Sequence, residues 1–384
     1  MSHPFATATR RGAAALTAMV ALTGLALTTS PEAEAATIAT RDRALQRSLE
    51  GLVRNPDVPA ALASVRDEHG RVTNYTAGVA DIRTRAEVPT DGYVRIASNT
   101  KMYTAVVVLQ LAGEGKLKLD DSVETYLPGV VRGEGIDAGK ITVRQLLQHT
   151  SGLKDNAFLD EGILPIRDRY FDARELLDSI LAQGPAFPPG TDWDYRNGAY
   201  VLLGLIAQKV AGRPFAELVT TRIIDRLGLS ETYYPGPGDR TIRKPHAKGY
   251  LPVEEGKLAD ITEFDPSIAG AAGQMIATPS DLNKFLVGLH TGRLLKPREQ
   301  AEMRRTVPTS FPPGWTYGLG LIKFELSCGG TAYGHGGDAD GYESRAAITT
   351  DGRAVTVVIT NDDPAGDTTM KLIEIFDAAL CAKK

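Results

Sequence analysis

The chain has 384 residues and a formal net charge of −4, with 42% hydrophobic and 23% charged residues. This length and composition predict a globular protein with a sizeable core, in one large domain or two closely packed ones. The acidic balance argues against a nucleic-acid partner, which needs a basic face to neutralise its phosphates. The 6 His and 2 Cys are scattered without a CxxC or HxxxH pair, so we expect neither a metal site nor a cofactor.

The first 35 residues have the features of an export signal. An arginine pair at positions 10 and 11 precedes an apolar, small-residue stretch over 12–27, and an Ala-Glu-Ala cleavage site follows at 33–35. A membrane anchor is the alternative, but the stretch is short and rich in Ala, Gly and Thr. The arginine pair also allows a twin-arginine signal, although the bulky apolar residues expected after it are missing. We therefore predict general secretion of a soluble, extracellular protein without stable membrane insertion.

Hydrophobic periodicity and turn residues predict the elements in chain order. A helix over 41–52 is followed by two strands, 59–66 and 71–79. Six helices then occupy the middle of the chain: 101–114, 143–148, 172–183, 200–210, 214–223 and 280–289. Three β-rich runs come next, 316–325, 344–350 and 354–360, with a hairpin turn at Asp351-Gly352, and a helix over 368–381 closes the chain.

Strands at both ends with helices between them predict an α/β fold of the α+β type. The N- and C-terminal strands would form one antiparallel sheet flanked by helices, with a mostly helical lobe inserted. We expect the α/β lobe to comprise residues 36–95 and 296–384. The helical lobe would comprise residues 96–295, and the signal peptide residues 1–35.

Ser98 and Lys101 form a Ser-x-x-Lys pattern at the start of an apolar helix. Residues three apart share a helical face, so the amine can take the proton of the serine hydroxyl, which is otherwise a poor nucleophile. The pattern alone is weak, and it occurs again at Ser151 and Lys154. There it encloses Gly152 and runs into polar residues, which favours a turn. Ser98 is therefore the predicted nucleophile.

Tyr195 and Asn197 lie in the loop before the predicted 200–210 helix and form the only Tyr-x-Asn of the sequence. A tyrosine held near cations can relay protons, and an amide offers a substrate both a donor and an acceptor. The alternative is a tyrosine packed on the core and an asparagine that caps the helix. When a Tyr-x-Asn motif stands alone, this structural role is more frequent than a catalytic one.

His335, Gly336 and Gly337 are expected immediately before a C-terminal strand. Glycines let a substrate approach the backbone, and an edge strand can pair with a peptide or supply an oxyanion-hole N–H. A second His-x-Gly begins at His290, where Gly292 is placed as a C-terminal cap of the preceding helix. We interpret that second motif as a helix stop.

Ser-x-x-Lys, Tyr-x-Asn and His-x-Gly occur in this order in suitable contexts, and the combination is far more specific than any one of them. Together with segments 109–117, 142–153 and 317–321, they make nearly the whole mature chain resemble the penicillin-recognising serine hydrolases. Within that family the sequence is most similar to the branch of class C β-lactamases and secreted serine D-alanyl-D-alanine carboxypeptidases.

The resemblance implies a catalytic role for each motif. Ser98 would become acylated, Lys101 and Tyr195 would share the proton transfers, and Asn197 would bind the amide of the substrate. His335 would assist electrostatically, in the place where other members carry lysine or histidine. Which of Lys101 and Tyr195 takes the first proton stays open.

The resemblance also implies which residues face Ser98 across the substrate-binding cleft. The backbone N–H groups of Ser98 and Asp338 would form the oxyanion hole. Gly336, Gly337, Asp338 and Asp340 would contact the substrate.

Cys328 and Cys381 are the only cysteines. Export favours their pairing, and two buried thiols are the alternative. The secreted carboxypeptidases share a matching pair, so the resemblance implies a disulfide.

Three departures from the carboxypeptidases concern their grip on the substrate. The carboxypeptidases usually have threonine at the positions of Gly336 and Asp338. They have an arginine, which grips the terminal carboxylate of the substrate, at the position of Ile322. A tryptophan that lines their cleft corresponds to about Ile268. Asp338 and Asp340 would repel a carboxylate and suit a cationic or neutral group. His-Gly-Gly also resembles the D-aminopeptidases and D-stereospecific amidases.

Three functions remain in view. The first is a D-alanyl-D-alanine carboxypeptidase that acts on peptidoglycan stem peptides through an acyl-enzyme on Ser98. The second is a D-aminopeptidase, D-stereospecific amidase or esterase, and the third is a β-lactam-binding sensor or β-lactamase. Each takes a peptide or a β-lactam as its small-molecule partner, and we expect a monomer.

Overall fold

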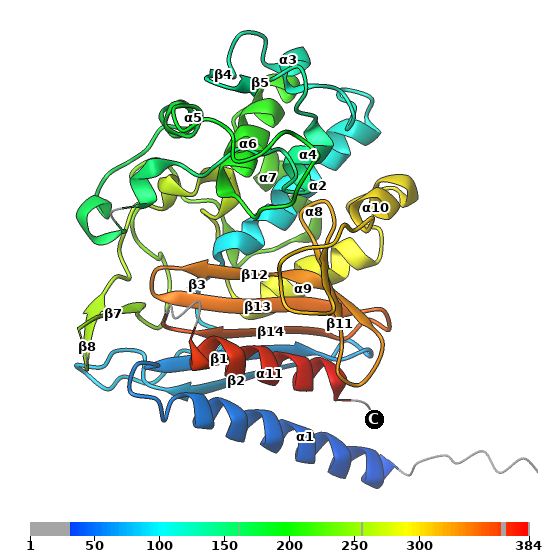
Figure 1. Ribbon diagram of the computed structural model, residues 1–384. Helices are drawn as coiled ribbons and strands as arrows, with labels where there is room; N and C mark the ends of the chain where they lie inside the picture. The colour runs from blue at the N-terminus through cyan, green and yellow to red at the C-terminus, as the bar shows by residue number, and fades with distance from the viewer. Residues whose placement is uncertain (1–30, 161, 255, 362–365, 383–384) are drawn as a thin grey trace, which may run out of the picture.

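The computed structural model describes residues 31–160, 162–254, 256–361 and 366–382. Its centre is a seven-stranded antiparallel sheet with the strand order β10-β11-β12-β13-β14-β1-β2 (Figure 1). The strands are β1 (Ala60–Arg66), β2 (Val72–Gly78), β10 (Trp315–Tyr317), β11 (Ile322–Glu325), β12 (Thr331–Ala339), β13 (Tyr342–Thr349) and β14 (Ala354–Ile359). Strands from both ends of the chain thus share one sheet, and the predicted fold class is confirmed.

Helices cover both faces of the sheet, so the central strands β13 and β14 are buried on both sides. Leu62 of β1 and Val358 of β14 are register partners in one hydrophobic core, whereas the neighbouring pair Ala61 and Ile359 belongs to a second core. The covering helices are α1 (Pro31–Leu52) and α11 (Asp367–Cys381) on the second core and α9 (Pro279–His290) on the first. The sheet therefore separates two cores.

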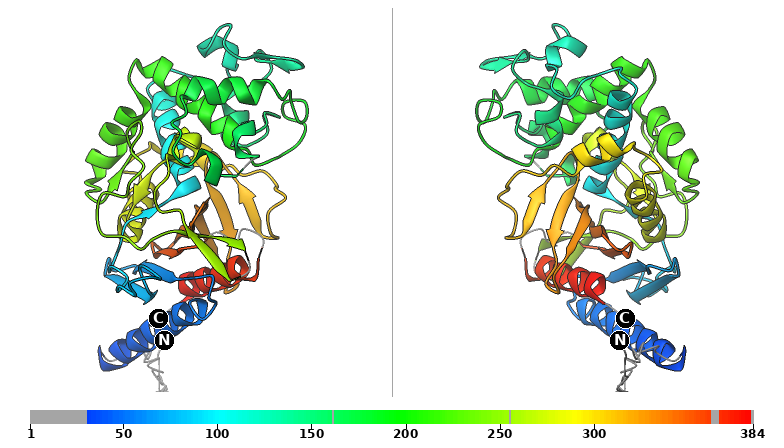
Figure 2. Two further views of the ribbon diagram at one scale, coloured as in Figure 1. Left: turned by 90° about the vertical axis from the view of Figure 1, so that its left-hand side faces the viewer. Right: turned by 90° about the vertical axis from the view of Figure 1, so that its right-hand side faces the viewer.

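The segment between β2 and β10 is mostly helical and stands above the sheet (Figure 2). Besides α9, its α-helices are α2 (Thr100–Gly113), α3 (Val123–Tyr126), α4 (Val143–Leu147), α5 (Ala173–Leu181), α6 (Asn197–Ala211), α7 (Phe215–Val219), α8 (Asp225–Leu227) and α10 (Pro297–Met303). Its 3₁₀ helices are η1 (Ala97–Asn99), η2 (Ala157–Leu159), η3 (Leu164–Ile166), η5 (Pro266–Ile268) and η6 (Gly270–Ala272), and η4 (Thr220–Ile224) is a π-helical turn. The predicted 214–223 helix is thus longer, running through a π-turn to Leu227. The division of the chain into two lobes stays a prediction.

Short strands complete the fold. β3 (Val94–Arg95) and β6 (Thr232–Tyr233) both pair with β9 (Ile276–Ala277). Two separate hairpins are β4 (Arg132–Gly133) with β5 (Ile136–Asp137) and β7 (Tyr250–Glu254) with β8 (Lys257–Asp260).

Two strand predictions need correction. The run 316–325 is a hairpin of β10 and β11, because the chain reverses where Gly318 N–H donates to Leu321 O (2.7 Å) and Gly320 has a φ of 72°. The His335 motif lies within β12 rather than before a strand. Glycine has weak strand propensity, so this glycine-rich strand gives no clear signal in the sequence.

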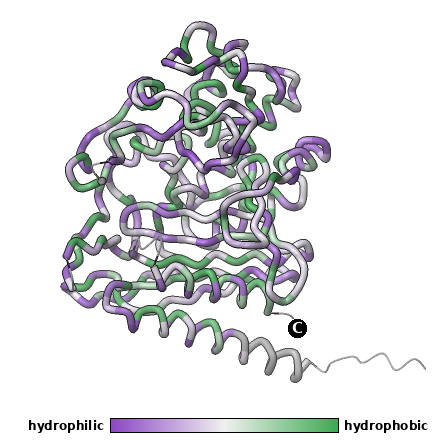
Figure 3. Tube along the Cα trace, viewed as in Figure 1, coloured by the Kyte–Doolittle hydropathy of each residue, from purple (hydrophilic) through white to green (hydrophobic). Residues whose placement is uncertain are grey.

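Helix α2 is enclosed on all sides. Residues 102–109 are all 0% exposed, and an apolar pattern around the whole circumference is typical of a buried helix. Figure 3 shows apolar residues gathered along β14 of the sheet as well. A polar residue in the first turn of α2 is therefore drawn into the interior.

Cys328 and Cys381 form a disulfide between the loop after β11 and the end of α11. Residues 1–30, which hold most of the predicted export signal, lie outside the described residues, and α1 begins at Pro31. Within the described ranges, every helix is too short or too polar to cross a membrane.

Candidate active site

Ser98 lies on η1, directly before α2. The preceding residue, Ala97, has a φ of 45°, a left-handed conformation that is uncommon for a residue with a Cβ. The bend is held from outside: β3 pairs with β9, and Ile96 N–H donates to Met275 O (3.1 Å). Ser98 is partly exposed, whereas Asn99 is fully buried. The local backbone thus presents the serine at the edge of a packed interior.

Lys101 is 0% exposed, and its Nζ lies within hydrogen-bond distance of three oxygens. They are Ser98 Oγ (2.9 Å), Asn197 Oδ1 (2.7 Å) and the carbonyl oxygen of Ala272 (3.1 Å). A neutral amine donates two hydrogen bonds and accepts one. When Lys101 is neutral, the hydroxyl of Ser98 can therefore donate to it while the other two contacts persist.

Burial lowers the pKa of Lys101 from 10.5 to about 7. The carboxylates of Asp155 and Asp338 act in the opposite direction and do not cancel the cost of burial. A large fraction of the lysine is consequently neutral at neutral pH. This is the state that can take a proton from Ser98.

Asn197 is the first residue of α6, but its side chain does not cap that helix. The Oδ1 atom accepts the hydrogen bond from Lys101 Nζ instead, across 96 positions in the sequence. The amide is therefore turned toward the serine and lysine, as expected for a group that contacts the substrate.

Tyr195 lies over Lys101, with Nζ 4.7 Å from its ring centroid. Its hydroxyl is buried and makes no well-formed hydrogen bond with the residues that the structure describes. Burial raises the pKa of Tyr195 well above its usual value, and the neighbouring Ser98 hydroxyl acts in the opposite direction. Tyr195 is thus a neutral phenol beside the nucleophile, which is a proton donor rather than a ready base.

His335 lies behind Tyr195, with the ring centroids 6.0 Å apart. Its Nδ1 contacts the carbonyl oxygen of Gly336 (2.5 Å) and its Nε2 the hydroxyl of Tyr317 (2.9 Å). Burial, with a smaller contribution from Lys101, lowers the pKa of His335 to about 3. The ring is therefore neutral at neutral pH and supplies no positive charge to the site.

The two glycines after His335 differ in their surroundings. A Cβ on Gly337 would lie 2.3 Å from the carbonyl oxygen of Ile96 and 2.6 Å from Asn99 Nδ2, so only glycine lets β12 pack on η1. A Cβ on Gly336 would meet first the end of the Arg345 side chain, at 3.2 Å. Gly337 therefore brings the backbone of Asp338 alongside the nucleophile turn.

Asp338 and Asp340 both line the pocket that opens beside Ser98. Asp338 accepts a hydrogen bond from Arg345 Nη1 (2.7 Å), and Arg345 also binds the buried Glu343 (2.8 Å). Asp340 forms no ion pair with any residue of the described ranges, and burial raises its pKa. Asp340 is thus the uncompensated carboxyl of this pocket.

The pocket has an apolar wall and one cation. Besides Ser98, Asn197 and the two aspartates, the lining residues include Phe264, Ile268 and Arg95. Arg95 is 2% exposed, and its Nε and Nη2 donate to backbone carbonyls while its guanidinium lies over Phe264, 3.9 Å from the ring centroid. Its Nη1 has no hydrogen-bond partner in the described part of the chain. At the position where the carboxypeptidases carry their arginine, this chain has the buried Ile322, and the neighbouring Lys323 pairs with Glu325.

Sequence reasoning missed three side chains around this site. Arg95 precedes the serine motif, Arg345 is the register partner of Gly336 on β13, and His149 packs against Tyr195. His149 lies in segment 142–153, which carried the resemblance but was assigned no role. The position of Arg345 follows only from strand register, which the sequence does not reveal.

The competing motifs lie elsewhere. A Cβ on Gly152 would lie 2.0 Å from the carbonyl oxygen of Phe187, and Lys154 Nζ donates to the carbonyl of Gln183 (3.2 Å), so Ser151 belongs to a packed turn.

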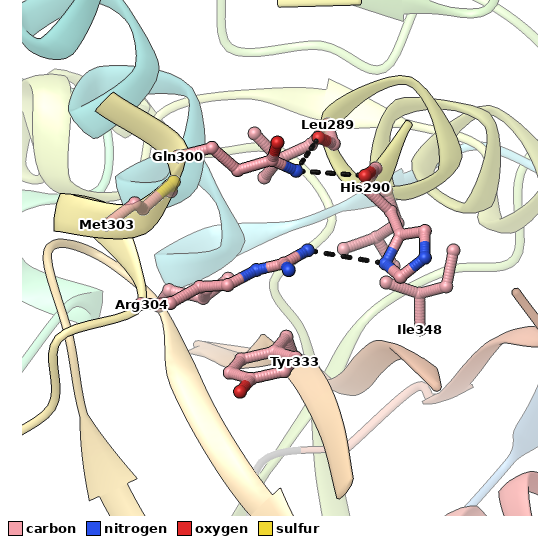
Figure 4. Close-up of a pocket in the computed structure, with 9 residues that line it drawn as sticks. Leu289, His290, Gln300, Met303, Arg304, Tyr333 and Ile348 are labelled. Carbon is pink, nitrogen blue, oxygen red and sulfur yellow. Dashed lines mark hydrogen bonds between the residues drawn. The ribbon is translucent and has the colours of Figure 1, made fainter. Parts of the chain in front are cut away.

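His290 ends α9, and Gln300 Nε2 donates to the carbonyl oxygens of Leu289 and His290 (both 2.9 Å), as Figure 4 shows. The pocket in Figure 4 shares no lining residue with the pocket at Ser98. Among the described residues, no group of three or more His, Cys, Asp or Glu is arranged to hold a metal ion.

The fold and this arrangement define a serine hydrolase with a buried lysine in the first turn of the helix that follows the serine. The Beta-lactamase family model matches residues 45–380, and the chain belongs to that family. Penicillin-binding protein 4 of Amycolatopsis lactamdurans is 28% identical over 82% of this chain and 84% of its own length. A β-lactamase of Pseudomonas fluorescens is 28% identical over 71% of this chain and 72% of its own length.

Solved structures give a similar picture. A D-stereospecific amidohydrolase from Streptomyces sp. is 39% identical, with a TM-score of 0.80 over 89% of this chain and 99% of its own. The D-amino acid amidase of Ochrobactrum anthropi SV3 is 27% identical, also with a TM-score of 0.80, over 89% of this chain and 98% of its own. The chain is thus similar both to a penicillin-binding protein and to a D-amino acid amidase.

Proposed function

We propose that this protein is a D-stereospecific amidohydrolase that cleaves amides, esters or short peptides of D-amino acids. The observation that carries the proposal is the pocket beside Ser98, in which Asp340 has no cationic partner among the described residues and β11 supplies no arginine to grip a carboxylate. An α-ammonium group suits this pocket, and the apolar wall at Phe264 and Ile268 suits an apolar side chain. The likeness to the amidohydrolase from Streptomyces sp. supports the same substrate class.

The proposed reaction begins with the attack of Ser98 Oγ on the carbonyl carbon of the substrate. Neutral Lys101 takes the serine proton, since its pKa is about 7 while that of Tyr195 is raised. The backbone N–H groups of Ser98 and Asp338 stabilise the oxyanion. Tyr195 donates its proton to the departing amine and regains one from Lys101.

Deacylation uses Lys101 as the base a second time. Water gives a proton to Lys101 as its oxygen attacks the ester, and Ser98 Oγ leaves with a proton. Asn197 holds the lysine and the amide of the substrate throughout. The products are a D-amino acid and an amine or alcohol.

Hydrolysis of D-Phe amide compared with L-Phe amide and diacetyl-Lys-D-Ala-D-Ala tests the proposal, with Ser98→Ala as the inactive control. We expect release of ammonia from the D-amide, little from the L-amide and slow release of D-Ala from the peptide. Rapid D-Ala release without amide hydrolysis would instead establish the carboxypeptidase, the second candidate. The specific feature in its favour is Arg95, which lines the pocket and whose Nη1 has no hydrogen-bond partner among the residues that the structure describes.

A second comparison tests Asp340. Asp340→Asn is expected to raise KM for D-Phe amide by about threefold to tenfold, because an ion pair with the ammonium is lost. N-acetyl-D-Phe amide carries no ammonium, so its KM should be unchanged. An equal change in KM for both amides would show that Asp340 does not recognise the ammonium group of the substrate. Turnover of nitrocefin measures the third hypothesis, a β-lactamase or β-lactam sensor.

We also propose that the protein is exported and acts outside the cell. The signal-like residues 1–35 and the disulfide support this location.

A further inference from the structure

One residue outside the three motifs holds the loop that carries Tyr195. The carbonyl oxygen of His149 accepts a hydrogen bond from Asp194 N–H (3.0 Å), and His149 Nδ1 accepts one from Arg196 N–H (3.1 Å). Between these two bonds, the ring of His149 packs on the ring of Tyr195 with centroids 4.4 Å apart. His149 therefore contacts three consecutive residues, and Tyr195 is the middle one.

The backbone of His149 is unusual for a residue with a side chain. It follows the C-cap of α4 and has a φ of 62°. Helices commonly end with a residue in this conformation, which is usually glycine and sometimes asparagine, because a Cβ is strained there. A histidine at such a position accepts strain that glycine would avoid, so its side chain must contribute something that glycine lacks.

Packing alone does not explain the side chain. His149 is 1% exposed and lies among Tyr195, Tyr200 (5.1 Å), Tyr317 (4.7 Å) and Trp193 (6.2 Å), measured between ring centroids. Because Nδ1 accepts a hydrogen bond, the neutral ring carries its proton on Nε2, and Nε2 has no partner in the described ranges. A ring chosen only to fill space would not bury an unsatisfied donor. The acceptor at Nδ1 is the feature that a phenyl ring could not supply.

We propose that His149 is a positioning residue, which holds Tyr195 in place over Lys101 through the backbone of Asp194 and Arg196. The proposal rests on the proton-transfer role proposed above for Tyr195. Proton transfer is sensitive to small displacements of the donor, and the Tyr195 hydroxyl makes no well-formed hydrogen bond of its own with the described residues. The ring of Tyr195 also packs on Phe311, Tyr317 and His335, but its shortest ring contact is with His149, and the backbone on both of its sides is held by bonds that His149 accepts.

Two substitutions separate the acceptor from the backbone. His149→Gly relieves the strained φ but removes the acceptor and the ring. His149→Asn tolerates the same φ, and its Oδ1 can replace Nδ1 as acceptor. We expect kcat of the Gly variant to fall by about 10- to 100-fold with KM within about threefold of wild type, the size of effect known for small misplacements of catalytic groups. The fall in log kcat for the Asn variant should be less than half of the fall for the Gly variant.

The measurement must separate positioning from partial misfolding. Burst titration with p-nitrophenyl acetate counts the Ser98 sites that react. The acylation rate with an unactivated methyl ester, whose leaving alkoxide must take a proton, is then expressed per reactive site. A merely structural role would lower the number of sites and leave the rate per site unchanged. A per-site rate for His149→Gly within twofold of wild type, or equal rates for the Gly and Asn variants, would overturn the proposal.

The same assay keeps this proposal distinct from the proposed function. If wild type acylates with the ester but does not cleave D-Phe amide, the substrate class is wrong while the per-site comparison of the His149 variants still decides the role of His149. If wild type cleaves the amide and the variants match it per site, only the role of His149 is wrong.

Discussion

Replacement of Lys101 by methionine tests the electrostatics on which the proposed mechanism depends. Methionine keeps the length and apolar character of the lysine stem but cannot carry a charge or a proton. In wild type the lysine is wholly buried, and burial lowers its pKa from 10.5 to about 7. Lys101→Met should therefore abolish turnover and also change how stability depends on pH.

The size of the stability effect follows from linkage. Between the folded pKa of about 7 and the unfolded value of 10.5, the unfolded chain binds a proton that the folded chain does not. The penalty of the buried charge is fully present below about pH 7 and is relieved as the pH rises. From about pH 7 to about pH 9, the free energy of unfolding should rise by about 2 kcal/mol in wild type from this group alone.

Urea unfolding at several pH values measures the effect, with the difference between wild type and Lys101→Met taken at each pH. The two curves should diverge in favour of wild type by about 2 kcal/mol over that interval. Lys154→Met is the matched control, because this second Ser-x-x-Lys lysine is only partly buried. A constant difference between wild type and Lys101→Met across the interval would refute the lowered pKa. The acid limb of kcat/KM in wild type should have its midpoint near the same pH, about 7.

Two further substitutions test the structure around the site. Gly337→Ala should lower the free energy of unfolding by about 1–3 kcal/mol and remove most of the activity, because the new Cβ meets the nucleophile turn. Gly336→Ala should leave stability and activity close to wild type, because its Cβ meets only the end of a side chain. Urea unfolding measures the stability of both variants, and amide hydrolysis measures their activity. Removal of the disulfide by Cys328→Ser with Cys381→Ser should lower the free energy of unfolding by about 4 kcal/mol, because the bond closes a loop of 53 residues. Chemical reduction of the disulfide in wild type should lower the free energy of unfolding by the same amount. If neither the double variant nor reduction lowered it, the disulfide would not stabilise the fold by closing this loop.

The sequence predicted what depends on short-range geometry. The contact between Ser98 and Lys101 follows from a spacing of three residues at a helix start, and the hairpin at Asp351-Gly352 from a local turn signal. The fold class followed from the order of strands and helices. By contrast, the bond between Lys101 and Asn197 spans 96 positions, and the sequence did not predict it. The family resemblance placed both residues in one site but gave Asn197 only a contact with the substrate.

What the sequence could not predict has common physical causes. β12 is rich in glycine, so its residues carry little strand propensity although the ladder with β13 runs from Ala332 to Ala339. The neutral state of His335 depends on burial, and burial is set by packing from distant segments. The spacing of the motif gives the ring's location but not its charge.

The charge of the pocket shows why these long-range contacts matter for the substrate as well as for the reaction. Asp338 and Asp340 look alike in the sequence, and both predict a site that disfavours carboxylates. In the folded protein Arg345 pairs with Asp338, which leaves Asp340 as the carboxyl without a described partner.

The same pair also affects the base. Asp338 is one of the two carboxylates that raise the pKa of Lys101, and Arg345 offsets part of its charge. An unpaired Asp338 would favour a protonated lysine, which cannot accept the serine proton. A single arginine on β13 thus helps to keep Lys101 neutral and concentrates the attraction for a substrate ammonium at Asp340.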